Sequence, residues 1–417
     1  MKLLLIIIVL LSAIIFRQNI CRLYNTITLF DQNKIVHNFR NMDTLGFSYN
    51  TAYHGINIAN FNQNQNQKFL LPEFFDSEYS CHIVDGWLEE NWVTGLVVLK
   101  VNNVTNTTLL FEQYYRDNNK DSKVISWSTG KSFVSALVGI AIQKGYIDSV
   151  DDYVTKYVPL LEKSGYNKIK IKDVLQMSSG VKFDEDYSNF WSDINKMSRT
   201  IALGGNFDNF MMSLQQEKPQ NQSKKVHNYI STDTQVLGMV IKGATNESLT
   251  EFLQKNLWVL GGFECNLFWL LDNANSQREL AFGTINTCTR DYARFGWLYL
   301  NKGKSPLDGK ELINAEWVNK SVTPDEPHLM PGTNKKFPLG YGYQWWIPGN
   351  PNNNTQPFGD YLAIGVYGQF IYVSPMHNVV IAMNSANPNY NVRNDLLELE
   401  TIEMFRAIAN KANSEKI

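Results

Sequence analysis

The chain is long enough to bury a sizeable core, since it has 417 residues, of which 44% are hydrophobic and 13% aromatic, and this length allows two or three domains. Its formal net charge is −2, from 38 basic and 40 acidic residues, and its basic residues form no long block. This balance argues against nucleic acid as the main partner.

Residues 1–20 predict a secretory signal peptide or a short membrane anchor. Lys2 precedes an apolar run, Leu3–Phe16, that is too short to span a bilayer comfortably. Ala13 is a small residue that could precede a cleavage site, but Leu11 is a poor partner for it, so both alternatives stay open. We expect a secreted, periplasmic or membrane-anchored protein, tethered through residues 3–16 if the leader is retained.

Residues 21–80 predict an N-terminal extension that is partly of low complexity. The tract 62–67 alternates Asn and Gln and need not pack. Four cysteines are too few for a disulfide scaffold, although Cys265 and Cys288 could pair in an oxidising compartment. Six Asn-x-Ser/Thr sequons fit a glycosylated chain, but they could also arise by chance in so Asn-rich a sequence. They begin at Asn103, Asn106, Asn221, Asn246, Asn319 and Asn353.

Regular patterns begin after Cys81, so we expect the main domain over residues 81–417. Two β-rich runs, 94–101 and 107–115, flank a polar turn and predict a hairpin. A second hairpin is predicted near the end of the chain, over 368–373 and 378–383. The simplest assembly is one antiparallel sheet drawn from both ends of the chain.

The segments between the two hairpins are mostly helical in pattern. Examples are 171–177, 233–243 and 290–301, and apolar positions spaced over 396–408 predict an amphipathic helix at the C-terminus. Helices are therefore expected to cover the sheet, with a mostly helical subdomain inserted at roughly residues 150–280. The fold class is α/β (α+β).

The stretch 126–133 offers a nucleophile and a base at the start of a buried helix. Residues 134–142 leave almost no polar face, so a helix from near Ser128 to Gly145 would be buried on most sides. Residues three apart share one helix face, so Ser128 and Lys131 could meet there. A lysine with a pKa lowered by desolvation can take the proton of a serine hydroxyl. Alternatively, Ser128 caps the helix and Lys131 is a surface cation.

A second Ser-x-x-Lys sequence, Ser179 to Lys182, tests whether this spacing alone predicts a catalytic pair. Ser179 lies at the expected end of a helix, and Gly180 breaks the helical register. Nothing then aligns the serine with the lysine, so Ser178 and Ser179 are interpreted as structural.

Tyr229 lies in a polar stretch before a predicted helix. A phenol placed between a serine and a lysine can relay protons during acyl transfer, and Ser231 could position the substrate or the lysine. The alternative is that Tyr229 packs its ring and that Ser231 caps the helix starting near Asp233.

The glycine-punctuated stretch 363–369 lies at the edge of the C-terminal hairpin. Glycine in a strand lets another backbone or a ligand approach closely, or marks a bulge. Acyl transfer needs two amide donors aimed at the developing oxyanion. The amides of Ser128 and Val366 could supply them.

Together and in this order, these motifs resemble the serine hydrolases of the class C β-lactamase-like (penicillin-recognising) family, most closely the branch with 6-aminohexanoate-dimer hydrolase and the β-lactamase-like esterases. Ser128 and Lys131 match Ser-x-x-Lys, Tyr229 with Ser231 matches Tyr-x-Asn/Ser, and residues 363–365 stand in place of Lys-Thr-Gly. The resemblance covers roughly Cys81 to the C-terminus. Further likeness runs through Leu175–Val181, Arg290–Gly296 and Tyr341–Trp346.

The resemblance implies a β-lactamase/transpeptidase-like fold and a set of site residues. Ser128, Lys131 and Tyr229 would be catalytic, and the Ser128 and Val366 amides would bind the oxyanion. The expected substrate-binding residues are Tyr187, Ser231, Gly365 and Tyr367. Where β-lactamases carry the lysine of Lys-Thr-Gly beside the substrate carboxylate, Ala363 has no charge, and this favours an ester or amide without that carboxylate.

Two other hydrolase chemistries fit less well. The sequence around Ser128 differs from Gly-x-Ser-x-Gly at position 126, the strand before it is thin, and the later histidines His227, His328 and His377 have no distinctive context. The six histidines are scattered without metal-ligand spacing, so no metal and no cofactor is expected.

We therefore expect a serine hydrolase that cleaves an ester or amide bond through an acyl-enzyme on Ser128. Its partner would be a small-molecule or peptide-like acyl substrate. The enzymatic alternative is a D-Ala-D-Ala peptidase or β-lactamase. The other alternative is a catalytically weak binding or scaffold protein of the same fold.

Overall fold

A computed structural model describes residues 21–63, 68–78, 80–217, 225–334 and 337–414, without the side chains of 391–395. The expected leader over residues 1–20 lies outside the described residues, as do most of the Asn/Gln tract and the sequon at Asn221. In the part of the chain that is described, no helix combines the length and the apolar character needed to cross a membrane.

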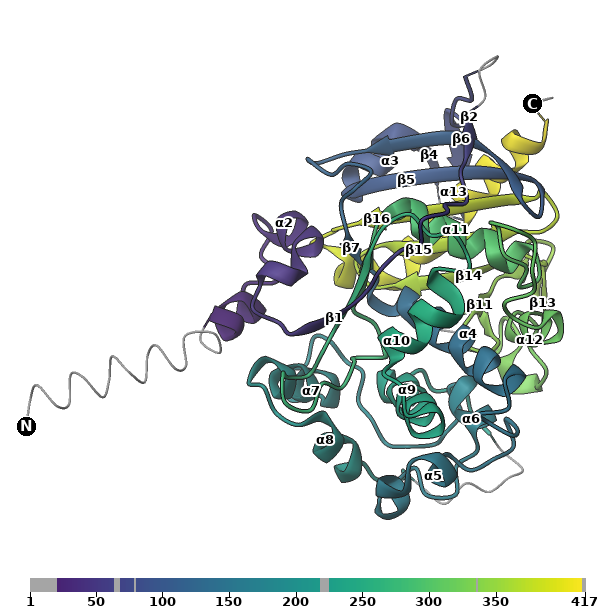
Figure 1. The fold of residues 1–417 in the computed structure, drawn as a ribbon. Helices are drawn as coiled ribbons and strands as arrows, with labels where there is room; N and C mark the ends of the chain where they lie inside the picture. Colours follow the sequence, from purple (N-terminus) through teal and green to yellow (C-terminus); the bar gives the residue numbers. More distant parts are fainter. Residues whose placement is uncertain (1–20, 64–67, 79, 218–224, 335–336, 415–417) are drawn as a thin grey trace, which may run out of the picture.

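The central sheet takes its strands from both ends of the chain (Figure 1), as predicted. In the described ranges its order is β10-β11-β14-β15-β16-β5-β6-β2. Neighbours are antiparallel except β2 and β6, which run parallel, so the sheet is mixed and not purely antiparallel as expected. The strands are β2 (Asn62–Gln63), β5 (Val93–Asn103), β6 (Asn106–Tyr114), β10 (Gly340–Tyr341), β11 (Trp346–Ile347), β14 (Tyr361–Gly365), β15 (Gln369–Ser374) and β16 (Val379–Ser385).

The central strands are buried on both faces because alternate side chains meet different helices. On one face lies α11 (Thr289–Leu300), where an added Cβ at Gly296 would come within 2.5 Å of Val380 and 3.0 Å of Ile371. On the other face lies α13 (Tyr390–Ser414), where the rings of Phe370 and Phe405 are 5.8 Å apart. The predicted hairpins and the C-terminal helix thus build one continuous core.

A smaller sheet has the order β1-β8-β9-β7. Its strand β1 (Tyr49–Ala52) comes from the N-terminal extension and pairs with β8 (Leu267–Leu270). The other two strands are β7 (Val124–Ile125) and β9 (Ile285–Thr287), and short two-stranded ladders join β3 (Phe74–Asp76) to β4 (Cys81–Ile83) and β12 (Gly349–Asn350) to β13 (Asn353–Pro357). Beside this sheet a disulfide joins Cys265 to Cys288, the pairing that the sequence left open.

Helices fill the region between the two hairpins (Figure 1), and the three examples predicted there begin within two residues of their expected positions. α4 (Gly130–Gln143) packs against α9 (Ser231–Thr245), and α4 also contacts β14. Further helices are α2 (Ile35–Arg40), α3 (Val84–Glu90), α5 (Val154–Tyr157), α6 (Ile171–Leu175), α7 (Asp193–Ala202), α8 (Phe207–Ser213), α10 (Leu249–Leu253) and α12 (Ala315–Ser321). The short helical turns are η1 (Met42–Thr44), η2 (Trp127–Thr129), η3 (Pro159–Lys163), η4 (Gln254–Trp258) and η5 (Pro327–Leu329).

Candidate active site

Ser128 lies in the 3₁₀ turn η2, which joins β7 directly to the buried helix α4. The residue before it, Trp127, has a φ of 41°, a left-handed conformation that a bulky residue rarely adopts. Aromatic rings hold this turn, since Phe39 and Phe30 lie 5.4 and 5.8 Å from the Trp127 ring. Ser128 is therefore presented by a constrained turn and not by a flexible loop.

Lys131 is brought against Ser128 by the first turn of α4. Its Nζ lies 2.9 Å from Ser128 Oγ, and it also donates to the Phe282 carbonyl at 2.5 Å. The residue is only 2% exposed. Burial lowers the pKa of Lys131 to about 7, although the nearby Glu185 carboxylate acts in the opposite direction. A neutral amine beside the serine hydroxyl is therefore accessible near neutral pH.

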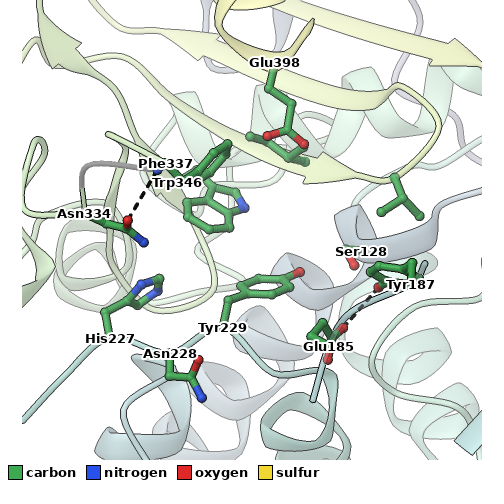
Figure 2. Close-up of a pocket in the computed structure, with 12 residues that line it drawn as sticks. Ser128, Glu185, Tyr187, His227, Asn228, Tyr229, Asn334, Phe337, Trp346 and Glu398 are labelled. Carbon is green, nitrogen blue, oxygen red and sulfur yellow. Dashed lines mark hydrogen bonds between the residues drawn. The ribbon is translucent and has the colours of Figure 1, made fainter. Parts of the chain in front are cut away.

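Tyr229 closes the other side of Ser128. Its hydroxyl points toward Ser128 (Figure 2), and a hydrogen bond with that serine partly opposes the burial that raises the pKa of Tyr229. The ring stacks on Trp346 at 5.2 Å, and Lys131 Nζ lies 5.3 Å from the ring centroid. The phenol is thus held in its protonated form, with its hydroxyl at Ser128 and its ring beside Lys131.

The end of strand β14 packs against the backbone around Ser128. A Cβ added to Gly365 would lie 2.5 Å from the Ser126 carbonyl oxygen and 3.1 Å from the Ser128 nitrogen, so only glycine allows this approach. Val366 follows directly and lines the same cavity as Ser128. The glycine therefore lets the end of β14, and with it Val366, lie against the backbone of Ser128.

These groups open onto a cavity of about 330 Å³ (Figure 2). Of the expected site residues, Ser128, Tyr187, Tyr229 and Val366 line it, whereas Lys131 and Ser231 are buried behind its wall. Tyr367 packs behind the serine turn, with its ring stacked on Phe30 at 4.8 Å. The lining residues are Ser128, Glu185, Tyr187, His227, Asn228, Tyr229, Asn334, Phe337, Trp346, Ile364, Val366 and Glu398.

Three titratable residues of the cavity wall were not singled out by the sequence motifs. Glu185 lies two positions before Tyr187, and its place in that acidic stretch is its one local signal. His227 has no distinctive sequence context, yet it lines the cavity, where burial lowers its pKa to about 4 and leaves the ring neutral. Glu398 belongs to α13, far along the chain, and accepts a hydrogen bond from Tyr390.

One group in the described part of the chain places metal-ligand atoms close together: Glu264, Cys265 and Cys288. The two sulfurs are joined to each other in the disulfide and are not thiolates. The group lies apart from the cavity around Ser128 and adds no ligand to it.

A mixed sheet built from both chain ends, with a Ser-x-x-Lys pair at the start of a buried helix, defines the β-lactamase/transpeptidase-like class of fold. A family model described as Beta-lactamase matches residues 90–401, and the chain belongs to this family. Its members and near relatives are hydrolases of this fold, so the family and the resemblance inferred from the motifs agree.

Individual relatives and solved structures are similar to the chain over most of its length. The 6-aminohexanoate-dimer hydrolase of Paenarthrobacter ureafaciens is 27% identical over 316 residues, covering 73% of this chain and 76% of that protein. A Bacillus anthracis structure provisionally named 6-aminohexanoate-dimer hydrolase superposes with a TM-score of 0.74 at 20% identity, covering 91% of this chain and 95% of the other. The hydrolase EstCE1, which has promiscuous acyltransferase activity, gives a TM-score of 0.59 at 12% identity, covering 78% and 96%. At these identities the two structures establish a shared fold.

Proposed function

We propose that this protein is a serine hydrolase that cleaves an ester or amide bond through an acyl-enzyme on Ser128. The observation that carries this proposal is the buried Lys131, whose Nζ lies 2.9 Å from Ser128 Oγ and whose pKa is lowered to about 7. A serine becomes a useful nucleophile only when a neighbour can take its proton, and this lysine can do so near neutral pH.

In this mechanism, neutral Lys131 accepts the proton of Ser128 while Oγ attacks the substrate carbonyl carbon. The amides of Ser128 and Val366 stabilise the negative charge that develops on the carbonyl oxygen. The Tyr229 phenol donates a proton to the leaving alcohol or amine and regains one from the Lys131 ammonium. Water then attacks the acyl-enzyme, and the same groups return Ser128 to its starting state.

The cavity favours an acyl substrate that carries no carboxylate beside the reacting carbonyl. Ala363 is buried in β14 and offers no charge, and the cavity is lined by the carboxylates Glu185 and Glu398. None of the described lining residues is lysine or arginine. A small ester or a linear, peptide-like amide fits these walls. The name of the Paenarthrobacter relative, a hydrolase of a 6-aminohexanoate dimer, supports this choice.

Burst kinetics and intact-mass labelling with an activated ester test the mechanism. We expect a burst of one leaving group per active site and an added acyl mass on Ser128, both lost in Ser128→Ala. Full hydrolysis by Ser128→Ala would disprove the mechanism. Absence of label on the folded protein at every pH from 6 to 10 would instead support a binding or scaffold role.

The family match makes a β-lactamase or D-Ala-D-Ala peptidase the second candidate. A chromogenic cephalosporin and a D-Ala-D-Ala peptide separate the two functions. We expect both to be turned over much more slowly than simple esters, because position 363 lacks the cation that would bind their carboxylate. Turnover of the cephalosporin at the rate of simple esters would contradict the role given to Ala363.

A further inference from the structure

Glu185 joins the cavity wall to the groups around Lys131. Its carboxylate accepts hydrogen bonds from the Ser231 amide at 3.0 Å, from Ser231 Oγ at 2.5 Å and from the Tyr187 hydroxyl at 3.0 Å. Figure 2 shows Glu185 beside Tyr187, facing the cavity that contains Ser128. Ser231 begins α9, so Glu185 links the loop before α7 to the helix that packs on α4.

These contacts determine whether the Ser231 hydroxyl donates a hydrogen bond to Lys131 or accepts one from it. A serine hydroxyl has one proton, and that of Ser231 is donated to Glu185. Toward Lys131 Nζ, 3.4 Å away, the Ser231 oxygen can then only accept. The Phe282 carbonyl, which also contacts Nζ, is an acceptor as well.

A neutral lysine amine has two N–H bonds and one lone pair. With both Ser231 and Phe282 as acceptors, the two N–H bonds have partners, and the lone pair is left facing the third neighbour, Ser128 Oγ. That is the arrangement in which Lys131 can take the serine proton. If the hydroxyl of Ser231 could rotate freely, it could donate to the amine and occupy the lone pair instead.

We propose that Glu185 is a positioning residue of this hydrolase, which orients the Ser231 hydroxyl so that the Lys131 lone pair faces Ser128. It acts through Ser231 and does not exchange a proton with the substrate. Since this role rests on the proposed acyl-enzyme chemistry of Ser128, its test is read alongside the labelling of Ser128.

The negative charge of Glu185 gives a second, separable effect. Around Lys131 the titratable groups are Glu185 and Tyr229, and around Glu185 they are Lys131 and the phenols Tyr166, Tyr187 and Tyr229. Burial raises the pKa of the Glu185 carboxyl, and Lys131 opposes that rise. Glu185 in turn raises the pKa of Lys131 against the larger effect of burial. Removing this charge should therefore lower the pKa of Lys131 further.

Two substitutions separate orientation from charge. In Glu185→Gln the single amide oxygen can still accept from the Ser231 hydroxyl without the charge, while the acceptor of the Ser231 amide is lost. We therefore expect the acid limb of kcat/KM to move to lower pH with a plateau within about threefold of wild type. In Glu185→Ala the hydroxyl of Ser231 is released, and we expect the plateau of kcat/KM to fall about 10- to 100-fold, the size of effect that misplacing a catalytic group produces. Asp186→Asn is the matched control, because the Asp186 carboxylate bonds Ser188 and the Asn189 amide within its own loop, and this variant should leave the profile unchanged.

A double-mutant cycle with Ser231→Ala tests whether Glu185 acts through that serine. We expect the double variant to lose about as much activity as either single variant, because both break the same chain of contacts. Losses that multiply, or a wild-type plateau in Glu185→Ala, would overturn the proposal. So would a Glu185→Gln variant that acylates at the normal rate but accumulates acyl-enzyme, since Glu185 would then be the base for deacylation.

Two controls distinguish a failure of the Glu185 proposal from a failure of the acyl-enzyme mechanism on which it rests. Each Glu185 and Ser231 variant is checked by its thermal unfolding midpoint and by stoichiometric labelling of Ser128, which show that the site has folded. If Ser128→Ala retains hydrolysis, the acyl-enzyme mechanism fails whatever the Glu185 variants do. If Ser128 is essential and the Glu185 variants match wild type, the mechanism stands and only the role of Glu185 is wrong.

Discussion

The two Ser-x-x-Lys sequences of this chain have the same spacing and opposite surroundings. Ser128 and Lys131 are carried by η2 and the first turn of α4, with 2.9 Å between Oγ and Nζ and the lysine fully enclosed. Ser179 is also buried, but it follows the end of α6, and Gly180 turns the chain away with a φ of 69°. Lys182 lies exposed on the extended segment that follows.

The difference shows what the motif requires physically. Continuous helix places the serine and the lysine on one face, and burial of the lysine removes the water that would keep it charged. The second sequence has neither, and its serine instead accepts a hydrogen bond from the Val181 amide. Spacing is therefore necessary for the pair but supplies neither the contact nor the lowered pKa.

The largest contrast is expected between the two serines. Ser128→Ala should reduce ester hydrolysis by about 10³-fold or more, because it removes the nucleophile. Ser179→Ala should leave kcat within about twofold once the fraction of folded protein is taken into account, because a residue outside the reacting groups changes stability and not chemistry. Steady-state rates with an activated ester measure both. Equal losses in the two variants would remove the distinction between the sites.

The two lysines give the next contrast. Lys131→Met fills similar space without a base, and we expect kcat to fall about 10²- to 10⁴-fold, the range that general-base catalysis supplies. Lys182→Met changes an exposed side chain and should leave kcat unaltered. Stopped-flow measurement of the acylation step tests this directly. A Lys131→Met variant that acylates at the wild-type rate would show that another group activates Ser128.

A smaller contrast is expected between two glycines. Gly365→Ala would place a methyl group 2.5 Å from the Ser126 carbonyl oxygen and push β14 away from Ser128, so we expect kcat to fall about 10²-fold through the loss of an oxyanion donor. Gly180→Ala forces alanine into a left-handed conformation and should destabilise the protein by about 1–2 kcal/mol while kcat is kept. Calorimetry and steady-state kinetics on both variants separate stability from rate. The reverse pattern would show that β14 does not contribute to the site.

The last and smallest contrast is between a buried and a solvated lysine, and it is read from the pH dependence of activity in the wild-type protein. Lys131 must be neutral to accept the serine proton, so activity should be lost as pH falls below its pKa of about 7 and should reach a plateau above it. A lysine in contact with water would require a pH near 10. The dependence of kcat/KM on pH gives the midpoint. A midpoint near 10 would mean that Lys131 keeps the pKa of a solvated lysine.

Local patterns were enough to predict the parts of the fold and site that depend on short stretches of chain. Runs of β-branched residues marked the hairpins, and the apolar stretch after Lys131 marked a buried helix that the structure contains as α4. Tyr229 and Val366 are far from Ser128 in the chain, and they were expected beside it from the order of the motifs and the family resemblance. The structure brings both to the cavity that Ser128 lines.

Features that depend on distant pairing left no local pattern. Strand β1 and the short β2, at the edge of the Asn/Gln tract, are ordered by partners far along the chain, at β8 and β6. Glu185 and Ser231 are 46 residues apart, and their contact becomes visible only once α9 is placed beside the loop before α7. Such residues look like ordinary surface acids or polar caps until tertiary packing assigns them a neighbour.

The aromatic support of the serine turn has a consequence for where this protein can be cut. The family match begins at residue 90, yet Phe30 and Phe39, which pack on Trp127 and Tyr367, precede it. A fragment starting at the family boundary would lose these rings and would leave the edges of β6 and β8 without their neighbouring strands. The packing around Ser128 therefore extends beyond the segment that the family model matches, and a domain exchange limited to that segment would separate the nucleophile from its support.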